Sequence, residues 1–327
     1  MRIRRGYMRH AAARGATAAA VCAMAASAAA QSARDALRDA VAGERLGAGY
    51  AQLINLSATP DISAANYRIA PDDGGGDGAR LDLFRLPVQR PWMALTRDTD
   101  LYWRAAGGYL QLRQDLPLDA QGDGTVRGRW QAYSGSLGVL ASVRLGEGFA
   151  LEPALDVGLA RLQNRASYDG QAQFLQPLLD GLLFNWHTDA YLVTPSLGLQ
   201  WNGLAGGGRL SLHGRLAHTW LTSFGESDPV QSFRESADLY SLRGEYVHRT
   251  GLLLGGRPLN WLGYGGVAGF IGANRDALGF NTVLELGGGF ELPLALAAGP
   301  PVRARLFAGY LRGENVTGWT LGFSLPF

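Results

Sequence analysis

Two pairs of side chains in this sequence have the types and spacing of hydrolytic chemistry. Ser211 and His213 stand two residues apart, and residues two apart share one face of an extended chain, where a histidine can activate a hydroxyl nucleophile. His187 and Asp189 have the same spacing, and an acid beside a histidine favours a general base. Whether either pair can react depends on the elements that carry it.

Those elements are predicted to be β-strands, because period two recurs from about residue 49 onward and a helical period does not. In the last segment apolar residues take the odd positions from Trp319 to Phe327, while small or polar residues take the even ones. The same alternation occurs over 149–159, 191–201, 209–220 and 280–292. Each segment therefore has one apolar face and one face of charge, hydroxyl and glycine.

The composition narrows the class of protein. The chain has 327 residues with 46 glycines, 8 Trp, 12 Tyr and 12 Phe and a net charge of +2, which is too apolar and too weakly charged for a disordered protein. Mean hydropathy is -0.04, and beyond residue 30 no window of about 18 apolar residues predicts a membrane helix. A soluble fold or a barrel with an apolar outside and a polar inside remains.

Residues 1–30 have the order of a secretory signal peptide: an arginine-rich start, an apolar stretch and small residues at Ala28 to Ala30. We expect cleavage after Ala30. The only cysteine, Cys22, lies in this segment, so the exported chain has no thiol chemistry. The segment holds five of the 30 basic residues and no acidic one, so the exported chain has 25 basic and 28 acidic residues and a net charge of -3. No nucleic-acid partner is expected.

About twelve strands are predicted, with ten as the alternative because the first three are the least regular. Several are long enough to cross a bilayer with tilt, which takes roughly 9 to 11 residues. The expected strands are 50–58, 79–86, 101–113, 126–145, 149–165, 188–202, 208–223, 237–250, 260–273, 279–292, 302–313 and 317–327.

The connections alternate in length, as in bacterial barrels with short periplasmic turns and longer extracellular loops. If the first strand runs outward, 114–125, 166–187 and 223–236 are outer loops. The inner turns then include 146–148, 203–207 and 251–259. The long inner connection 87–100 is an exception to the pattern.

The carboxyl end carries Thr320, Gly322, Leu325 and the terminal Phe327. This order of polar residue, glycine, hydrophobic residue and aromatic residue resembles the signal read by the outer-membrane barrel assembly machinery. An unpaired last strand would present such an edge for recognition. The alternative is an ordinary amphipathic strand.

Over residues 31–327 the sequence resembles a bacterial outer-membrane β-barrel, and more narrowly a solitary autotransporter-type barrel that lacks a long passenger. The resemblance implies an all-β, closed antiparallel transmembrane barrel over 49–327, after the signal peptide 1–30 and a helical segment 31–48. It also implies contact with outer-membrane lipid and lipopolysaccharide, and biogenesis with periplasmic chaperones and the barrel assembly machinery. No cofactor is implied.

The predicted helical stretch runs from Ser32 to Leu46. Ser32 followed by Asp35 is close to a capping box, and Gly47 ends the helical pattern. In autotransporters a helix before the barrel occupies the pore, so this segment could fill the lumen. A short helix on the periplasmic side is the alternative.

The pair Ser211 and His213 is similar to the Ser and His of barrel phospholipases and lipid A deacylases. In those enzymes the pair faces lipid, whereas here the alternation places both side chains in the lumen and no third orienting group is evident. A structural role is favoured over catalysis.

The pair His187 and Asp189 is similar to the acid and histidine of omptin proteases, which also need paired carboxylates. Asp98 and Asp100 have suitable spacing, but the predicted topology puts them at the periplasmic end, far from the outer rim. We therefore expect a chain without a catalytic or metal site.

The charges expected in the lumen are mixed in sign, so they would pair with one another rather than select ions, and a narrow or plugged lumen is favoured. A structural or translocation-related barrel is the first hypothesis. A narrow or gated pore and a barrel lipid hydrolase or protease are the alternatives. The expected lumen charges are Glu152, Asp156, Arg209, Arg215, Arg243, Glu245, Glu285, Glu291, Arg303 and Arg305.

Overall fold

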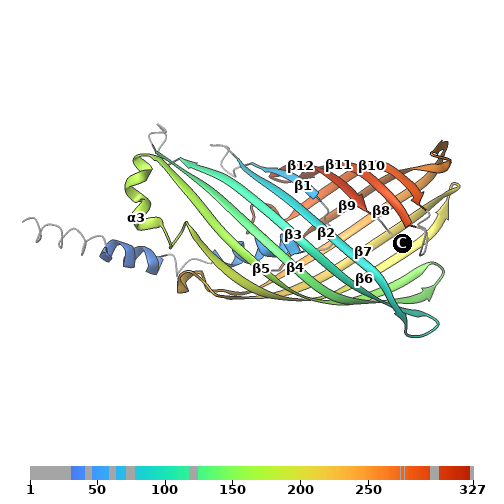
Figure 1. Ribbon diagram of the computed structural model, residues 1–327, viewed down its shortest axis with the longest axis horizontal. Helices are drawn as coiled ribbons and strands as arrows, with labels where there is room; N and C mark the ends of the chain where they lie inside the picture. The colour runs from blue at the N-terminus through green and yellow to red at the C-terminus, as the bar shows by residue number, and fades with distance from the viewer. Residues whose placement is uncertain are drawn as a thin grey trace, which may run out of the picture.

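The computed structural model of the chain describes residues 31–40, 46–58, 64–70, 78–117, 124–272, 274–275, 277–294 and 302–324. The predicted signal peptide and its cleavage site after Ala30 lie outside these residues. The described strands form one closed antiparallel barrel with a helix inside it (Figure 1). None of the helices in the described ranges is long and apolar enough to cross a membrane.

Twelve strands build the barrel, as the alternation predicted. Each strand pairs with its neighbours in the chain, and β1 closes the ring against β12 from Ala65↔Thr320 to Ile69↔Val316. The strands are β1 (Ala64–Ile69), β2 (Ala79–Ala94), β3 (Thr99–Pro117), β4 (Gly124–Gly146), β5 (Phe149–Gly170), β6 (Trp186–Ala205), β7 (Gly208–Phe224), β8 (Arg234–Leu254), β9 (Arg257–Ile271), β10 (Thr282–Leu294), β11 (Val302–Gly313) and β12 (Val316–Ser324).

The helices lie before the barrel and in its loops. Helix α2 (Leu46–Ala58) lies within the barrel, and residues 31–40 form a helix outside its mouth (Figure 1). The loop between β5 and β6 holds the short helices η1 (Gln171–Leu175) and α3 (Gln176–Leu179), and η2 (Pro229–Gln231) precedes β8. Helix α2 crosses the boundary expected near residue 48.

The predicted first strand, 50–58, was wrong, because these residues belong to α2 and the first strand is β1. The residues from Tyr50 to Ser57 are all buried. A helix enclosed on every side has no polar face, so its sequence lacks the helical period that would reveal it.

The long inner connection expected over 87–100 was also wrong, because β2 continues to Ala94 and only 95–98 remain between β2 and β3. Pro87 and Pro91 suggested an end to the strand. Beyond Phe84, however, β3 is the only described partner of β2, and proline is tolerated on such an edge.

The two ends of the barrel differ as predicted, with short turns at one end and longer loops at the other. Two-residue turns join β4 to β5, β6 to β7 and β8 to β9, and both residues of each turn have positive φ, as in Glu147 (50°) and Gly148 (84°). This conformation matches the twist of a hairpin and favours glycine. Longer connections lie at the other end, between β5 and β6, β7 and β8, and β9 and β10. The short-turn end is therefore periplasmic and the long-loop end extracellular.

The outer surface is apolar in its middle band. Leu286, Trp319 and Leu321 are among its most exposed residues, at 73%, 66% and 63% of their full accessibility. β4 has 23 residues, about twice the length needed to cross a bilayer. The strands therefore extend beyond the apolar band, and their extracellular parts carry polar residues outward.

Candidate functional site

Helix α2 lies in the extracellular half of the lumen and is tied to the wall by polar contacts along its length. Gln52 Nε2 donates to the carbonyl oxygen of Asn274 at 3.0 Å, and Thr219 Oγ1 donates to Asn55 Oδ1 at 3.0 Å. Near its lower end, Ser134 Oγ donates to the carbonyl of Ser57 at 3.0 Å. These bonds fix both the depth and the rotation of the helix.

Apolar packing surrounds the same helix. Leu53, Ile54 and Leu56 are buried in one cluster with residues from all twelve strands. Tyr50 packs against Trp130 and Trp186, with ring centroids 5.5 and 4.9 Å apart. The wall residues in this cluster include Tyr67, Leu81, Leu110, Ala132, Leu162, Leu192, Leu221, Leu239, Phe270, Val283, Leu311 and Val316. One side of the helix is thus packed against the wall as in a protein core, and a cavity of about 560 Å³ lies beside Tyr50, Leu53 and Trp130.

Gly108 on β3 lies directly against the last turn of the helix. A Cβ built at this residue would lie 2.0 Å from the carbonyl oxygen of Ser57. At the neighbouring Gly107, whose side faces outward, a Cβ would meet nothing within 4 Å. Gly108 therefore allows α2 to seat against β3.

Residues 31–40 lie on the extracellular side, against the loops. Arg34 donates to the carbonyl oxygens of Pro177 (2.6 Å) and Asp180 (2.7 Å), and Arg38 forms an ion pair with Asp228 at 2.6 Å. Most of these residues are exposed. The described part of the helix expected over Ser32 to Leu46, residues 32–40, thus lies neither in the lumen nor at the periplasmic end, and α2, which begins at Leu46, is the helix inside.

Below α2, the lumen is filled by charge. Glu291, whose side chain is fully buried, accepts from Arg209 at 2.5 Å, Arg305 at 2.9 Å and Asn260 at 3.2 Å. Arg305 also pairs with Glu245 at 3.0 Å. The acid thus joins three strands, β7, β9 and β11, to its own strand, β10.

The same network continues toward the helix. Arg243 pairs with Glu245 at 2.7 Å and with Glu285 at 3.6 Å, and lies 4.0 Å from the centre of the Tyr264 ring. Glu285 accepts from Tyr264 at 2.8 Å and from Thr320 at 2.7 Å. We call Arg209, Arg243, Glu245, Glu285, Glu291 and Arg305 the lumen network.

A second group of charges crosses from β3 to β7. Arg104 makes a two-pronged ion pair with Asp156, and Arg215 lies 3.8 Å from the same carboxylate. His213 Nε2 is 3.3 Å from Glu152. Eight of the ten expected lumen charges thus have an ion-pair partner of opposite sign, and the ninth, Glu152, pairs with a histidine that is charged only when protonated. The tenth, Arg303, is exposed on the face of β11 that carries Arg305.

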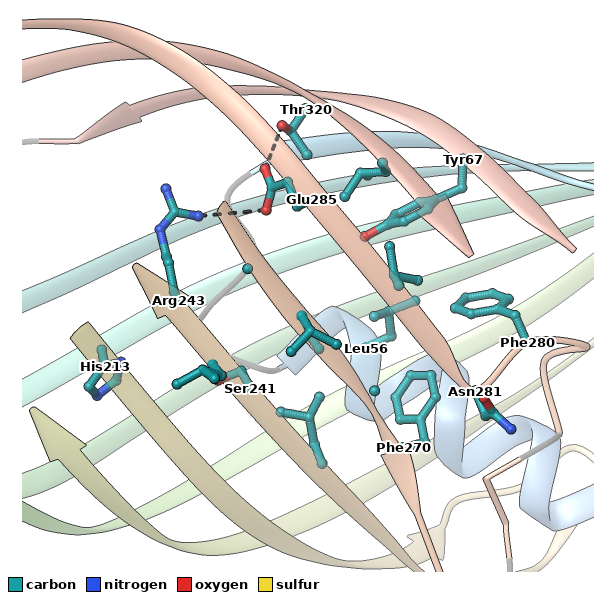
Figure 2. A pocket seen from close by; sticks show the side chains of 18 residues that line it. Leu56, Tyr67, His213, Ser241, Arg243, Phe270, Phe280, Asn281, Glu285 and Thr320 are labelled. Atoms are coloured by element: carbon teal, nitrogen blue, oxygen red, sulfur yellow. Dashed lines mark hydrogen bonds and ion pairs between the residues drawn. The ribbon is translucent and has the colours of Figure 1, made fainter. Parts of the chain in front are cut away.

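Two cavities remain between these groups. One, of about 140 Å³, lies directly beneath Leu56 and is lined by Arg243, Glu285 and Thr320 on one side and by Phe270 and other apolar residues on the other (Figure 2). The other, of about 160 Å³, is lined by Arg104, Asp156 and Arg215. His213 borders both. Both cavities are small, and each is bordered by charged side chains.

The two predicted pairs lie in different parts of the barrel, one in the lumen and one at the extracellular rim. Ser211 and His213 share the lumen face of β7, below the helix and away from lipid. At the extracellular rim, His187 Nδ1 lies 2.9 Å from Ser227 Oγ, while Asp189 makes a two-pronged pair with Arg161. The carboxylates of Asp98 and Asp100, which a site of the omptin type would need, do not lie near His187.

Asp98 and Asp100 lie at the periplasmic end, as predicted, in the β2–β3 turn and at the start of β3. Asp100 pairs there with Arg144 at 2.7 Å. Among the described residues, no group of three or more His, Cys, Asp or Glu is arranged to hold a metal ion.

The expected assembly signal lies partly outside the described residues, which end at Ser324. Thr320 contributes its hydroxyl to the lumen network, and Gly322 leaves room for the Phe307 ring, which a Cβ there would meet at 2.0 Å. Leu325 and Phe327 are not among the described residues.

Sequence reasoning missed the residues of α2, although one signal for them exists. The stretch Leu46–Ala58 contains no charged residue, and it precedes the barrel in the chain. An uncharged segment that fits neither an amphipathic helix nor an alternating strand for its whole length is typical of a helix buried on all sides.

Comparison with known proteins agrees with this architecture. The sequence matches the family described as solitary outer membrane autotransporter beta-barrel domain over residues 76–248, more than half of the chain. The chain belongs to this family of outer-membrane barrels. Its sequence matches no curated protein.

Solved autotransporter barrels have a similar fold. The transport unit of the autotransporter AIDA-I from Escherichia coli is 12% identical, with a TM-score of 0.52, over 86% of this chain and 97% of that one. The translocator domain of the autotransporter NalP from Neisseria meningitidis is 11% identical, with a TM-score of 0.51, over 81% of this chain and 86% of that one. At such identities the likeness concerns the fold alone.

Proposed function

We propose that this protein is a self-plugged outer-membrane barrel that carries its own short N-terminal segment to the cell surface. The observation that supports this is the path of the chain. Residues 31–40 contact extracellular loops through Arg34 and Arg38, α2 descends through the lumen, and β1 then begins the barrel.

The N-terminal segment must have crossed the membrane to reach this position. A chain exported to the periplasm can do so only if residues before the barrel pass outward through the lumen or are enclosed as the strands close around them. Once α2 is seated, its apolar residues are buried in one cluster with residues of the wall, and burial of this kind stabilises by about 25 cal/mol per Å². The helix thus closes the route that the segment used.

The surroundings that we propose follow from this placement. Outer-membrane lipid and lipopolysaccharide would face the apolar band, and the barrel assembly machinery and periplasmic chaperones would act during biogenesis. A narrow or gated pore is the competing hypothesis, since it would require α2 to leave its seat.

Cysteine labelling on intact cells tests the path of the chain. Asp39→Cys is expected to react with a membrane-impermeant maleimide as readily as Phe174→Cys in the exposed β5–β6 loop. Arg97→Cys, in the periplasmic β2–β3 turn, is the matched control and should react only after permeabilisation. Labelling of Asp39→Cys only after permeabilisation would contradict surface display.

We also propose that the barrel has no hydrolytic activity. His213 and its partner Glu152 lie in the lumen and away from lipid. At the rim, Asp189 pairs with Arg161, and the carboxylates of Asp98 and Asp100 lie at the other end of the barrel. Lipid or peptide turnover by purified barrel should be at background and unchanged in His213→Ala and His187→Ala. Turnover that either variant abolishes would overturn this proposal.

A further inference from the structure

Arginines form a continuous row on the outer face of the barrel near its extracellular end. The strand registers place Arg68 opposite Arg80, Arg80 opposite Arg113, Arg113 opposite Arg129 and Arg129 opposite Arg165. On the other side of β1, Thr317 lies opposite both Arg68 and Arg312. We call Arg68, Arg80, Arg113, Arg129, Arg165 and Arg312 the arginine row.

All six side chains point outward. Each is exposed, whereas neighbours such as Tyr67, Ile69 and Leu81 are buried in the lumen. The row crosses seven adjacent strands, β11 to β5 through the closing pair, which at roughly 4.8 Å per strand is about 29 Å. It therefore forms an extended surface rather than a point site.

The row lies just above the aromatic edge of the apolar band. Tyr109 and Tyr133 lie four residues from the row on β3 and β4, with ring centroids 5.1 Å apart. Tyr310 and Trp319 on β11 and β12 also have ring centroids 5.1 Å apart. Such aromatic girdles mark the membrane interface in outer-membrane barrels. The arginines are thus at the level of the outer-leaflet headgroups.

Five of the six arginines of the row have no ion-pair partner in the described part of the chain. Like charges directly opposite each other on paired strands are destabilising. Only Arg113 has a carboxylate within 4.0 Å among the described residues, Asp82 at 3.8 Å. The arginines of the lumen network differ, since Arg209, Arg243 and Arg305 each pair with a glutamate. An external anion would relieve the repulsion within the row.

A recess opens beside the row. It has a volume of about 910 Å³ and is lined by Arg68, Arg80, Arg113 and Arg312, with Tyr310 on its wall. Asp115 and Glu314 also line it, so the arginines outnumber the acids by two. A cavity of this size can take a sugar with its phosphate group.

We infer that the arginine row binds the phosphate groups of a phosphorylated glycolipid of the outer leaflet, lipopolysaccharide. The planar guanidinium fork matches phosphate oxygens and forms charge-assisted hydrogen bonds with them. The length of the row suits a headgroup with several phosphates, and the apolar band below it receives the acyl chains. This inference rests on the outer-membrane placement and not on the plug.

Binding of purified glycolipid to the detergent-solubilised barrel, followed by native mass spectrometry, tests the inference. The test variant is Arg80→Gln/Arg113→Gln/Arg129→Gln. The control, Arg90→Gln/Arg97→Gln/Arg249→Gln, makes the same charge change near the periplasmic end. Heat-modifiable gel mobility verifies that each barrel is folded. Asp72, Asp73 and Asp77 follow β1 in the chain and lie outside the described residues. None of the variants changes them.

The inference predicts that the row variant loses at least about tenfold in affinity, as expected when several charge-assisted hydrogen bonds are removed. The control variant should bind like the wild type, and enzymatically dephosphorylated glycolipid should bind the wild type about as weakly as the row variant binds the intact lipid. Equal binding by the row variant would overturn the inference. So would equal binding of the dephosphorylated lipid, or full competition by inorganic phosphate at the same concentration, which would indicate a site for the free anion.

Discussion

In the extracellular half of the lumen, α2 is held by packed apolar side chains, whereas in the periplasmic half the strands are joined across the lumen by ion pairs. Ile54 is fully buried among hydrocarbons, and Glu291 is fully buried among two arginines and an asparagine. Packing is non-directional and depends on volume. Ion pairs depend on keeping both partners. The extracellular half thus suits a helix that must enter the lumen and pack there. The periplasmic half suits a network that holds the strands together permanently.

The largest effect is expected from Glu291→Ala in the periplasmic half. Its loss leaves Arg209 and Arg305 without their shared carboxylate, and breaking a buried ion pair costs about 3 to 5 kcal/mol. Urea unfolding in lipid vesicles should show this loss. Asp98→Asn in the exposed β2–β3 turn should leave stability unchanged. Equal stability of Glu291→Ala and wild type would show that the lumen network does not brace the barrel.

In the extracellular half, Ile54→Ala should cost about 2 to 4 kcal/mol, as truncation of a fully buried aliphatic side chain does. Urea unfolding in lipid vesicles measures this loss of stability. Wild-type stability of Ile54→Ala would contradict a packed seat for the helix.

A smaller effect is expected from Gly108→Ala, since its Cβ would collide with the carbonyl of Ser57 at 2.0 Å. Moving α2 away from β3 should cost about 1 to 3 kcal/mol, the usual range for overpacking. Gly107→Ala on the outer face is the matched control. Proteolysis of α2 in the purified barrel should be faster in Gly108→Ala than in Gly107→Ala, and identical rates would contradict the seating contact.

The smallest effect concerns the docking of residues 31–40 on the loops. Burial raises the pKa of Asp228, but the Val230 N–H and the Arg38 guanidinium lower it more, so its pKa lies below the usual range. A carboxylate with a lowered pKa contributes above its ordinary pKa and loses that contribution as pH falls through the lowered value. Protease cleavage within 31–40 should therefore speed up only in acid. In Asp228→Asn, cleavage should be fast at every pH. If this variant keeps the pH response, the Arg38–Asp228 ion pair is not its cause.

The sequence was sufficient to predict the barrel because each wall residue has one of two environments. Trp319 and Thr320 alternate between lipid and lumen, and that alternation is a local property of the chain. The same logic predicted the lumen face of Glu291, Arg305 and Arg243.

The position of α2 could not be predicted in this way. Tyr50, Ile54 and Asn55 contact strands far away in the sequence, so their burial depends on the closed barrel and not on their neighbours. The arginine row is similar in kind, because Arg68 and Arg165 join one surface only through strand register. The register between strands decides which charges meet, and the alternation along one strand does not reveal that register.

The most direct test of the plug is conductance in planar bilayers for the wild type and for a variant lacking residues 46–58, both verified as folded by heat-modifiable mobility. The account predicts little conductance for the wild type, a large steady conductance for the deletion, and intermediate openings for Ile54→Ala. A wild type that is already open, or a folded deletion variant that conducts no more than the wild type, would contradict it.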